Sequence, residues 1–111
     1  MRSDRERLYD ILDAIDRIEA QAARGRNDFA GDEVAQTAVT RWVEIIGEAT
    51  RGLTEGLRQA HPEVPWRQMV AMRNVLIHGY FDIDVDLVWS VAENDLPKLR
   101  AQIEAIVDQL P

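Results

Sequence analysis

The sequence has no cysteine and no apolar run of the roughly 18 residues that a membrane-spanning helix needs. The missing cysteines exclude disulfide scaffolds, thiolate zinc sites and cysteine nucleophiles, and they fit a reducing cytosol. The first residues, Met1–Glu6, are charged and lack the apolar stretch of a signal peptide. At 111 residues the chain is long enough for one hydrophobic core. We therefore expect a soluble, cytoplasmic protein whose residues 1–111 form a single domain.

Basic side chains are the minority, because 13 Lys and Arg face 20 Asp and Glu and give a formal net charge of −7. Residues 41–73 are the exception, with five basic and four acidic side chains. Phosphate neutralisation supplies most non-specific affinity, so this balance excludes broad binding to duplex nucleic acid. Every basic residue except Lys98 is arginine; we ascribe most of this bias to composition, although guanidinium groups also suit bidentate contact with phosphate. Any contact with nucleic acid should therefore be local.

Apolar residues recur at helical spacing along nearly the whole chain. The first amphipathic stripe runs through Leu8–Ile18 and ends near a glycine-containing stop at Arg24–Asn27. The second is predicted to begin at Asp32, a suitable N-cap, and to continue as one long helix to the prolines of His61–Pro65. The sequence shows no strand signal and no internal repeat.

The third predicted helix covers residues 65–78, because Pro65 suits a first helical turn and Gly79 suits the left-handed residue that follows a helix. The fourth covers residues 84–110, with Asp84 as its N-cap.

Pro97 lies inside the fourth apolar pattern without breaking its register. We expect a kink near Asn94 and Asp95, where a second capping turn restarts the helix. These four amphipathic helices predict an all-α, up-and-down four-helix bundle with a kinked last helix.

Arg73 is unusual, because its position on the third helix points a guanidinium into an otherwise apolar ridge. A desolvated arginine needs a partner. Position alone favours a structural ion pair, with candidate carboxylates at Glu48, Asp82, Asp84 and Asp86. The alternative is an anion site.

Such an anion site would combine Arg73 with His78. A five-residue step on an ideal helix is about 140°, so these two side chains do not share a face, whereas Asn74 and His78 do. Convergence on one phosphate requires the reach of Arg73, a distorted helix end at Gly79, or a second subunit. Histidine titrates near neutrality, so with an arginine it is the minimum equipment for metal-free RNA cleavage by the substrate's own 2′-hydroxyl.

Other candidate sites carry weaker signals. His61 lies in a connection before a proline, where we expect a solvated helix terminus. The acidic run Asp82–Asp86 resembles a metal cluster, but acids at a helix start are ordinary capping residues, and we favour that interpretation. No zinc-protease, phosphate-loop or serine-hydrolase motif occurs, so the sequence predicts neither a metal nor a cofactor.

Residues Arg73–Tyr80 match the R-x4-H-x-Y motif of the HEPN superfamily, in its HepT-like branch. The resemblance covers essentially the whole chain, since further stretches look like that family's recurring phrases in their usual order. These stretches are Ile45–Ala49, His61–Trp66, Met72–Asn74, His78–Phe81 and Val88–Pro97.

The resemblance implies a HEPN-type bundle in a homodimer, whose two R-x4-H motifs face each other in a composite, metal-independent endoribonuclease site. It implies that His78 is the general acid or base, that Arg73 binds and stabilises the scissile phosphate, and that Asn74 orients His78 or the RNA. It also implies a toxin of a type II toxin–antitoxin system. The partner would be a minimal nucleotidyltransferase antitoxin that transfers AMP from ATP to Tyr80.

The predicted function is therefore a ribonuclease toxin acting on an RNA substrate. Arg51, Arg58 and Arg67 are predicted to add contacts to RNA phosphates, gathered into a groove by dimerisation. For Tyr80 the alternative is a loop aromatic whose ring packs on the core. For the whole chain the alternative is a non-catalytic helical subunit that presents nucleotide or substrate to a nucleotidyltransferase.

Overall fold

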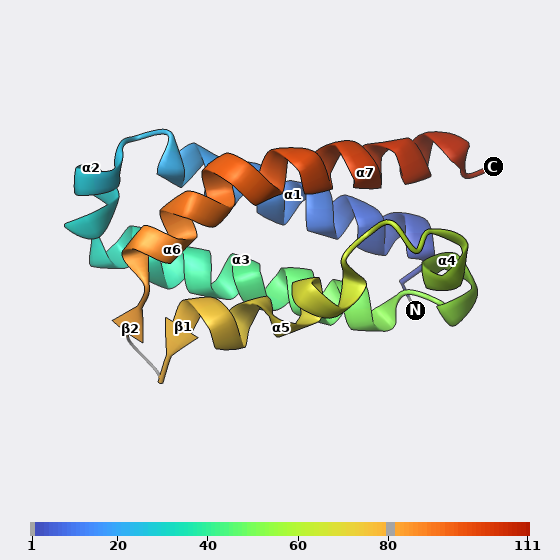
Figure 1. Ribbon diagram of the computed structural model, residues 1–111, viewed down its shortest axis with the longest axis horizontal. Coiled ribbons are helices and arrows are strands. Elements are labelled where there is room, and N and C mark those ends of the chain that lie inside the picture. Colours follow the sequence, from blue (N-terminus) through green and yellow to red (C-terminus); the bar gives the residue numbers. More distant parts are fainter. Residues whose placement is uncertain (1, 80–81) are drawn as a thin grey trace.

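The computed structural model describes residues 2–79 and 82–111. Its long helices run alternately up and down an elongated molecule of 43 × 25 × 23 Å, and α1 begins at the end where α7 ends (Figure 1). These helices confirm the predicted all-α four-helix bundle. They are α1 (Asp4–Ala22), α3 (Glu33–Gly52), α5 (Trp66–Leu76) and α7 (Leu96–Gln109).

Local capping explains where α1 and α3 begin. Ser3 and Glu6 form a reciprocal capping box at α1, and the Asp32 carboxylate accepts a hydrogen bond of 3.0 Å from the Ala35 N–H at α3. The predicted N-cap at Asp32 is therefore confirmed. Gly25, with a φ of 107°, follows α1 as the predicted glycine-containing stop.

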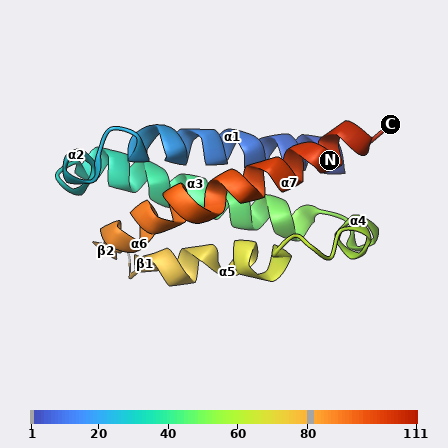
Figure 2. The ribbon, with the colours of Figure 1, turned by 45° about the horizontal axis from the view of Figure 1, so that its top comes forward.

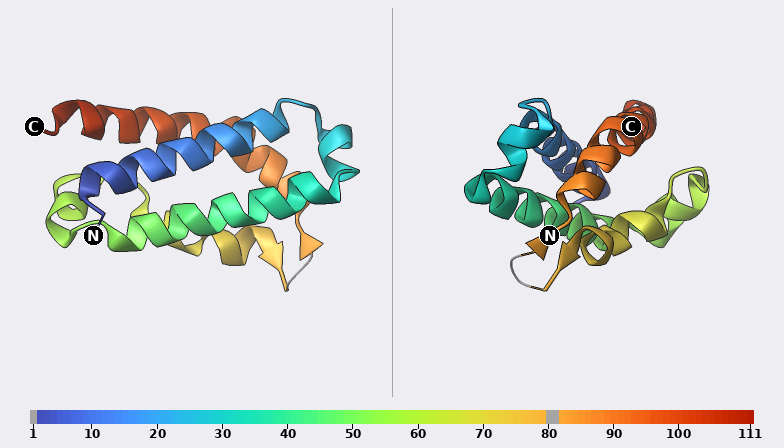
Figure 3. Two further views of the ribbon diagram at one scale, coloured as in Figure 1. Left: turned by 180° about the vertical axis from the view of Figure 1, so that it is seen from behind. Right: turned by 60° about the vertical axis from the view of Figure 1, so that its left-hand side comes forward.

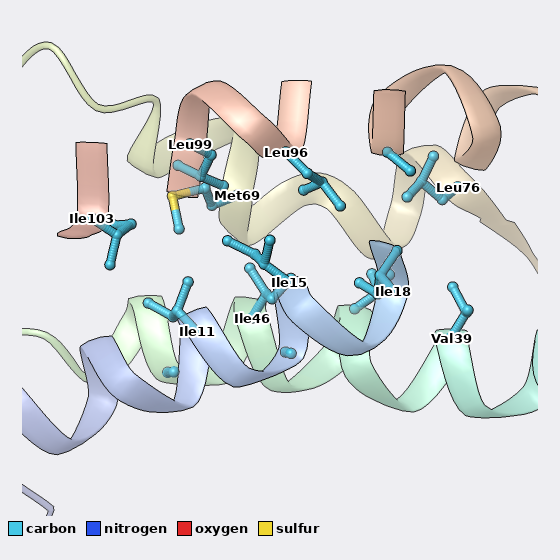
Figure 4. Packing of buried hydrophobic residues seen from close by; sticks show 14 of the residues in the cluster. Ile11, Ile15, Ile18, Val39, Ile46, Met69, Leu76, Leu96, Leu99 and Ile103 are labelled. Atoms are coloured by element: carbon cyan, nitrogen blue, oxygen red, sulfur yellow. The ribbon is translucent and has the colours of Figure 1, made fainter. Parts of the chain in front are cut away.

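The apolar stripes of the long helices meet in one core. α1 packs between α3 and α7, and α3 packs in turn against α5 (Figures 2 and 3). Ile15 of α1 and Ile46 of α3 are fully buried between these layers, next to Met69 of α5 (Figure 4). Burying a side chain of this size contributes about 1.5–3 kcal/mol. No helix in the described part of the chain is long and apolar enough to cross a membrane.

A short helix, α2 (Arg26–Ala30), lies between α1 and α3 and is not predicted by the sequence. It buries Phe29, and Gln36 of α3 donates hydrogen bonds to the carbonyls of Phe29 and Ala30 at its end. Five residues are too few to show helical periodicity, which explains the omission.

The second predicted helix is divided in two. α3 ends at Gly52, Leu53 is extended, and α4 (Glu55–Ala60) begins anew. Thr54 caps α4, and its N–H and hydroxyl both donate to the Asp4 carboxylate, at 2.9 and 2.6 Å. The prediction of one continuous helix is wrong because this tether comes from a residue 50 positions away, which apolar spacing cannot reveal.

The last predicted helix consists of α6 (Val85–Ser90), a π-helical turn η1 (Val91–Asp95) and α7. The Asp84 carboxylate caps α6, as predicted, by accepting from the Leu87 N–H at 3.0 Å. The kink lies where it is predicted, but the second capping turn is wrong, since no side chain caps α7. The Pro97 ring excludes the carbonyl four residues earlier, and the wider π turn accommodates this.

Candidate functional site

The candidate site lies where α5 ends. At Ile77 the chain leaves the helix (φ −126°, ψ 127°), and β1 (Ile77–His78) pairs antiparallel with β2 (Asp82–Ile83) in a small hairpin below the bundle (Figure 1). The prediction of a helix to residue 78 without strands is wrong, because strands of two residues are too short to show alternation. Gly79 has a φ of 73°, so the predicted left-handed conformation is confirmed, but within the hairpin turn.

Arg73 occupies the last turn of α5 and is half-buried. Its Nη2 donates a hydrogen bond of 3.2 Å to the carbonyl of Gly79, which ties the guanidinium to the turn. Within residues 2–79 and 82–111 no carboxylate forms an ion pair with Arg73. The predicted structural ion pair is therefore wrong: the hairpin turn brings a carbonyl to Arg73, and helix C-termini favour cations.

The carboxylates considered as partners of Arg73 are exposed or bind other groups. Glu48 is exposed on α3, Asp84 caps α6, and Asp86 forms an ion pair with Arg26. The capping interpretation of this acidic run is thus confirmed at Asp84. No group of three His, Asp or Glu side chains that could hold a metal ion occurs among the residues that the structure describes.

His78 is exposed on β1, and Asn74 is exposed on the last turn of α5. Because His78 has left the helix, the shared helical face predicted for Asn74 and His78 does not form. The hairpin relates Arg73 to His78 instead, since the guanidinium binds the carbonyl of the residue after His78. The pair is thus linked through the hairpin, with Arg73 half-buried at the end of α5 and His78 exposed on β1.

Asp82 also belongs to this site, although the sequence suggests it only as a carboxylate partner for Arg73 or as part of a capping run. It pairs directly with His78 across the hairpin. Side chains of directly opposite residues lie on the same face of an antiparallel ladder, so the carboxylate and the imidazole share a face. Their four-residue spacing resembles helical spacing and gives no signal of a hairpin.

A groove of about 960 Å³ extends along α5 as far as Asn74. Its walls come from the end of α3, from α4 with the loop after it, and from one face of α5. Arg51, Arg58 and Arg67 all line it, so one protomer brings together three of the predicted phosphate-binding arginines without a second subunit. Their contact with RNA stays a prediction.

Two further predicted positions are His61 and Tyr80. His61 ends α4, is 21% exposed, and places Nδ1 3.4 Å from Oε1 of Glu63. This agrees with a helix terminus, although one that is largely covered. Tyr80, the predicted site of AMP transfer, lies outside the described residues.

Comparison with known proteins identifies the family. The model described as "Ribonuclease HepT-like" matches residues 11–106. "Putative RNase MJ1380" of Methanocaldococcus jannaschii is 43% identical over 100 residues, which cover 89% of this chain and 92% of that protein. "Probable ribonuclease HepT" of Thermococcus cleftensis is 41% identical over 106 residues, covering 95% and 96% respectively. No solved structure matches. The chain therefore belongs to the HepT-like ribonuclease family.

Proposed function

We propose that this protein is a metal-independent endoribonuclease whose catalytic residues are Arg73 and His78. The observation that carries the proposal is the hairpin after α5, where the Arg73 guanidinium binds the carbonyl of Gly79, the residue that follows the exposed His78. Membership of the HepT-like ribonuclease family supports RNA as the substrate. The arginine-lined groove that reaches Asn74 supports it further, because an acidic chain needs such a local site to hold RNA.

The proposed reaction is transesterification within the RNA. His78 accepts the proton of the 2′-hydroxyl, whose oxygen forms a new bond to the adjacent phosphorus. The bond from phosphorus to the 5′-oxygen breaks, and that oxygen takes a proton from an acid, leaving a 2′,3′-cyclic phosphate and a 5′-hydroxyl. Arg73 stabilises the charge that accumulates on the phosphate oxygens, as arginine forks do for phosphates.

A homodimer would complete this site. One neutral imidazole can accept a proton, but the leaving oxygen needs a second, protonated group. A second copy of the hairpin, brought opposite the first, would supply another His78 and another Arg73. The exposure of His78 on β1 leaves it free for such a juxtaposition.

Regulation by a minimal nucleotidyltransferase antitoxin completes the proposal as a toxin–antitoxin system. The Tyr80 phenol oxygen would attack the α-phosphorus of ATP, pyrophosphate would leave, and the phenolic proton would pass to solvent. Tyr80 follows Gly79, the residue whose carbonyl binds Arg73. The new phosphodiester would carry a negative charge close to Arg73 and compete with the RNA phosphate.

Cleavage of total RNA in EDTA by the unmodified protein tests the nuclease function. Four chains are compared after their fold is verified by circular dichroism: wild type, Arg73→Ala, His78→Ala and Arg17→Ala, the last as a control at an arginine that pairs with Asp13 and does not line the groove. We expect His78→Ala to lose about 10²–10⁴-fold in rate and Arg73→Ala about 10²–10³-fold. Arg17→Ala should cleave like wild type.

Two results would contradict the proposal. Equal cleavage by all four chains would identify a contaminating nuclease. No cleavage by unmodified wild type over a broad RNA panel would favour the non-catalytic subunit that presents nucleotide or substrate to a nucleotidyltransferase.

A further inference from the structure

The groove beside α5 is lined by guanidinium groups that have no carboxylate partner in the described part of the chain. Arg51, Arg58 and Arg67 line it, and in the described part of the chain none of them forms an ion pair or a side-chain hydrogen bond. Arg58 even has a covered Nε without a partner. Guanidinium groups left without carboxylates are available to an external anion, and their planar fork matches a phosphate.

The carboxylates of the same groove are engaged elsewhere. Glu55 accepts a hydrogen bond of 3.0 Å from Gln59, and Oε1 of Glu63 lies 3.4 Å from Nδ1 of His61. Three guanidiniums and two carboxylates line the groove, which gives it a formal charge of +1, and no carboxylate of the described residues forms an ion pair with these guanidiniums. The groove is net positive on a chain of net charge −7.

Trp66 gives the groove an aromatic wall. Its Nε1 donates to two backbone carbonyls, those of Arg58 at 3.2 Å and His61 at 3.0 Å. These bonds use the one polar group of the indole and fix the orientation of the ring. What Trp66 presents to the groove is therefore carbon surface, which nucleobases contact irrespective of their sequence.

The groove leads to the proposed catalytic turn. Arg67, Val70, Ala71 and Asn74 lie on one face of α5 and line it. At 1.5 Å per residue, this face carries the groove about 10 Å along the helix from Arg67 to Asn74. Asn74 lies shortly before the hairpin and is the sequence neighbour of Arg73, so the groove ends close along the chain to the proposed catalytic arginine.

We propose that this groove binds single-stranded RNA next to the scissile bond, with phosphates on Arg51, Arg58 and Arg67 and a base packed on Trp66. The inference rests on the proposed function for the position of the cut, but the binding itself does not. Cations that follow the backbone, beside an aromatic platform, are the usual means of binding single strands. Bases of a duplex are stacked inside and cannot reach Trp66.

Binding is measured with the His78→Ala chain, which leaves the RNA intact. The probe is a fluorescein-labelled, single-stranded oligouridine of about 12 nucleotides, compared with the same strand annealed to oligoadenosine. Affinities are taken from anisotropy over a series of salt concentrations. We add Arg51→Gln, Arg58→Gln and Arg67→Gln singly and together, with Arg17→Gln and Arg41→Gln as controls whose guanidiniums face carboxylates.

For three phosphate contacts, the logarithm of affinity should fall with the logarithm of salt with a slope of about −2. Each groove substitution should lower the magnitude of this slope by about 0.7 and the affinity at 0.1 M salt by about three- to fivefold. The controls should bind like the parent chain, and the duplex should bind more weakly than the single strand. Oligouridine should also quench tryptophan emission, and Trp66→Phe should remove that quenching while Trp42→Phe retains it.

The groove proposal would be overturned if the triple arginine variant bound oligouridine like the parent, or if the duplex bound as tightly as the single strand. Retained quenching in a folded Trp66→Phe chain would overturn the role of Trp66. These failures are separable from failure of the nuclease function. Wild type that binds through the groove without cleaving would refute catalysis alone, and wild type that cleaves while the groove variants bind normally would refute the groove alone.

Discussion

The arginines of this protein differ between two regions. On the helices away from the groove most of them face carboxylates: Arg17 pairs with Asp13 at 2.9 Å, and Arg100 of α7 pairs with Asp16 at 2.5 Å and with Glu19 of α1. Beside α5 the guanidiniums of the groove have no such partner among the described residues. In an acidic chain, arginines left without carboxylates indicate where an external anion can bind.

The helix break at Leu53 explains why one arginine of the groove, Arg51, lacks a carboxylate. Arg51 and Glu55 are four residues apart, which is the spacing of an ion pair on a continuous helix. Because α3 ends at Gly52 and α4 begins after Thr54, the two side chains are not within ion-pair distance. The tether from Asp4 to Thr54 thus frees a cation for the groove.

Outside the catalytic pair, the greatest loss of stability should come from changing the wall of the groove without changing its charge. Gly47 of α3 faces α5, where a Cβ would lie 3.5 Å from the carbonyl oxygen of Val70. Alanine fits at that distance, whereas Gly47→Leu should force α3 and α5 apart and lower the free energy of unfolding by about 1–3 kcal/mol. Urea unfolding measures this loss, and anisotropy should show weaker oligouridine binding.

Gly47→Ala is the matched control and should keep both stability and binding. If Gly47→Leu bound oligouridine as wild type does, the position of α5 against α3 would not shape the groove.

A smaller effect is expected in the paired region. Arg100→Gln removes the link between α7 and α1, and the partly exposed pair should cost at most about 1 kcal/mol in the free energy of unfolding. RNA affinity should not change, because Arg100 lies outside the groove. If Arg100→Gln bound RNA more weakly than Arg58→Gln, the paired arginines would matter more for RNA than those of the groove, contrary to our proposal.

The smallest effect concerns acid pH. Hydrogen bonds from the Ala35 N–H and from Arg24 lower the pKa of Asp32, and hydrogen bonds from Ser3 lower the pKa of Glu6. Carboxyls with a depressed folded-state pKa contribute stability that is present above their ordinary pKa of about 4 and is lost as pH falls through the folded-state value. The melting temperature should therefore decline below about pH 4, and less steeply in Asp32→Asn. If the melting temperature of Asp32→Asn fell with pH as steeply as that of wild type, Asp32 would not contribute to the acid sensitivity.

How much the sequence predicts depends on how local the cause is. The caps at Asp32 and Asp84 are predicted because each carboxylate binds an N–H three residues away. The break before α4 is not predicted, since it needs Asp4, and neither is the hairpin, whose strands have two residues each. In the site, too, features with a local cause are predicted and features that depend on distant residues are not.

The motif identifies Arg73 and His78 as a pair, but the carbonyl that binds Arg73 becomes available only through the turn. The arginines of the groove could be predicted from residues 41–73, the segment in which basic side chains outnumber acidic ones. Their convergence could not, because it depends on the break at Leu53. The role inferred for Trp66 depends on two backbone carbonyls that no sequence pattern marks.

We propose that Arg73 and His78, at the hairpin after α5, cleave RNA through the substrate's own 2′-hydroxyl. The most direct test maps the cut made by wild type in EDTA on a single-stranded RNA and then replaces the nucleotide 5′ to that cut by its 2′-deoxy form. We expect the parent RNA to yield a 2′,3′-cyclic phosphate and cleavage at the substituted position to disappear. Continued cleavage there, or a 3′-hydroxyl product from the parent RNA, would contradict it.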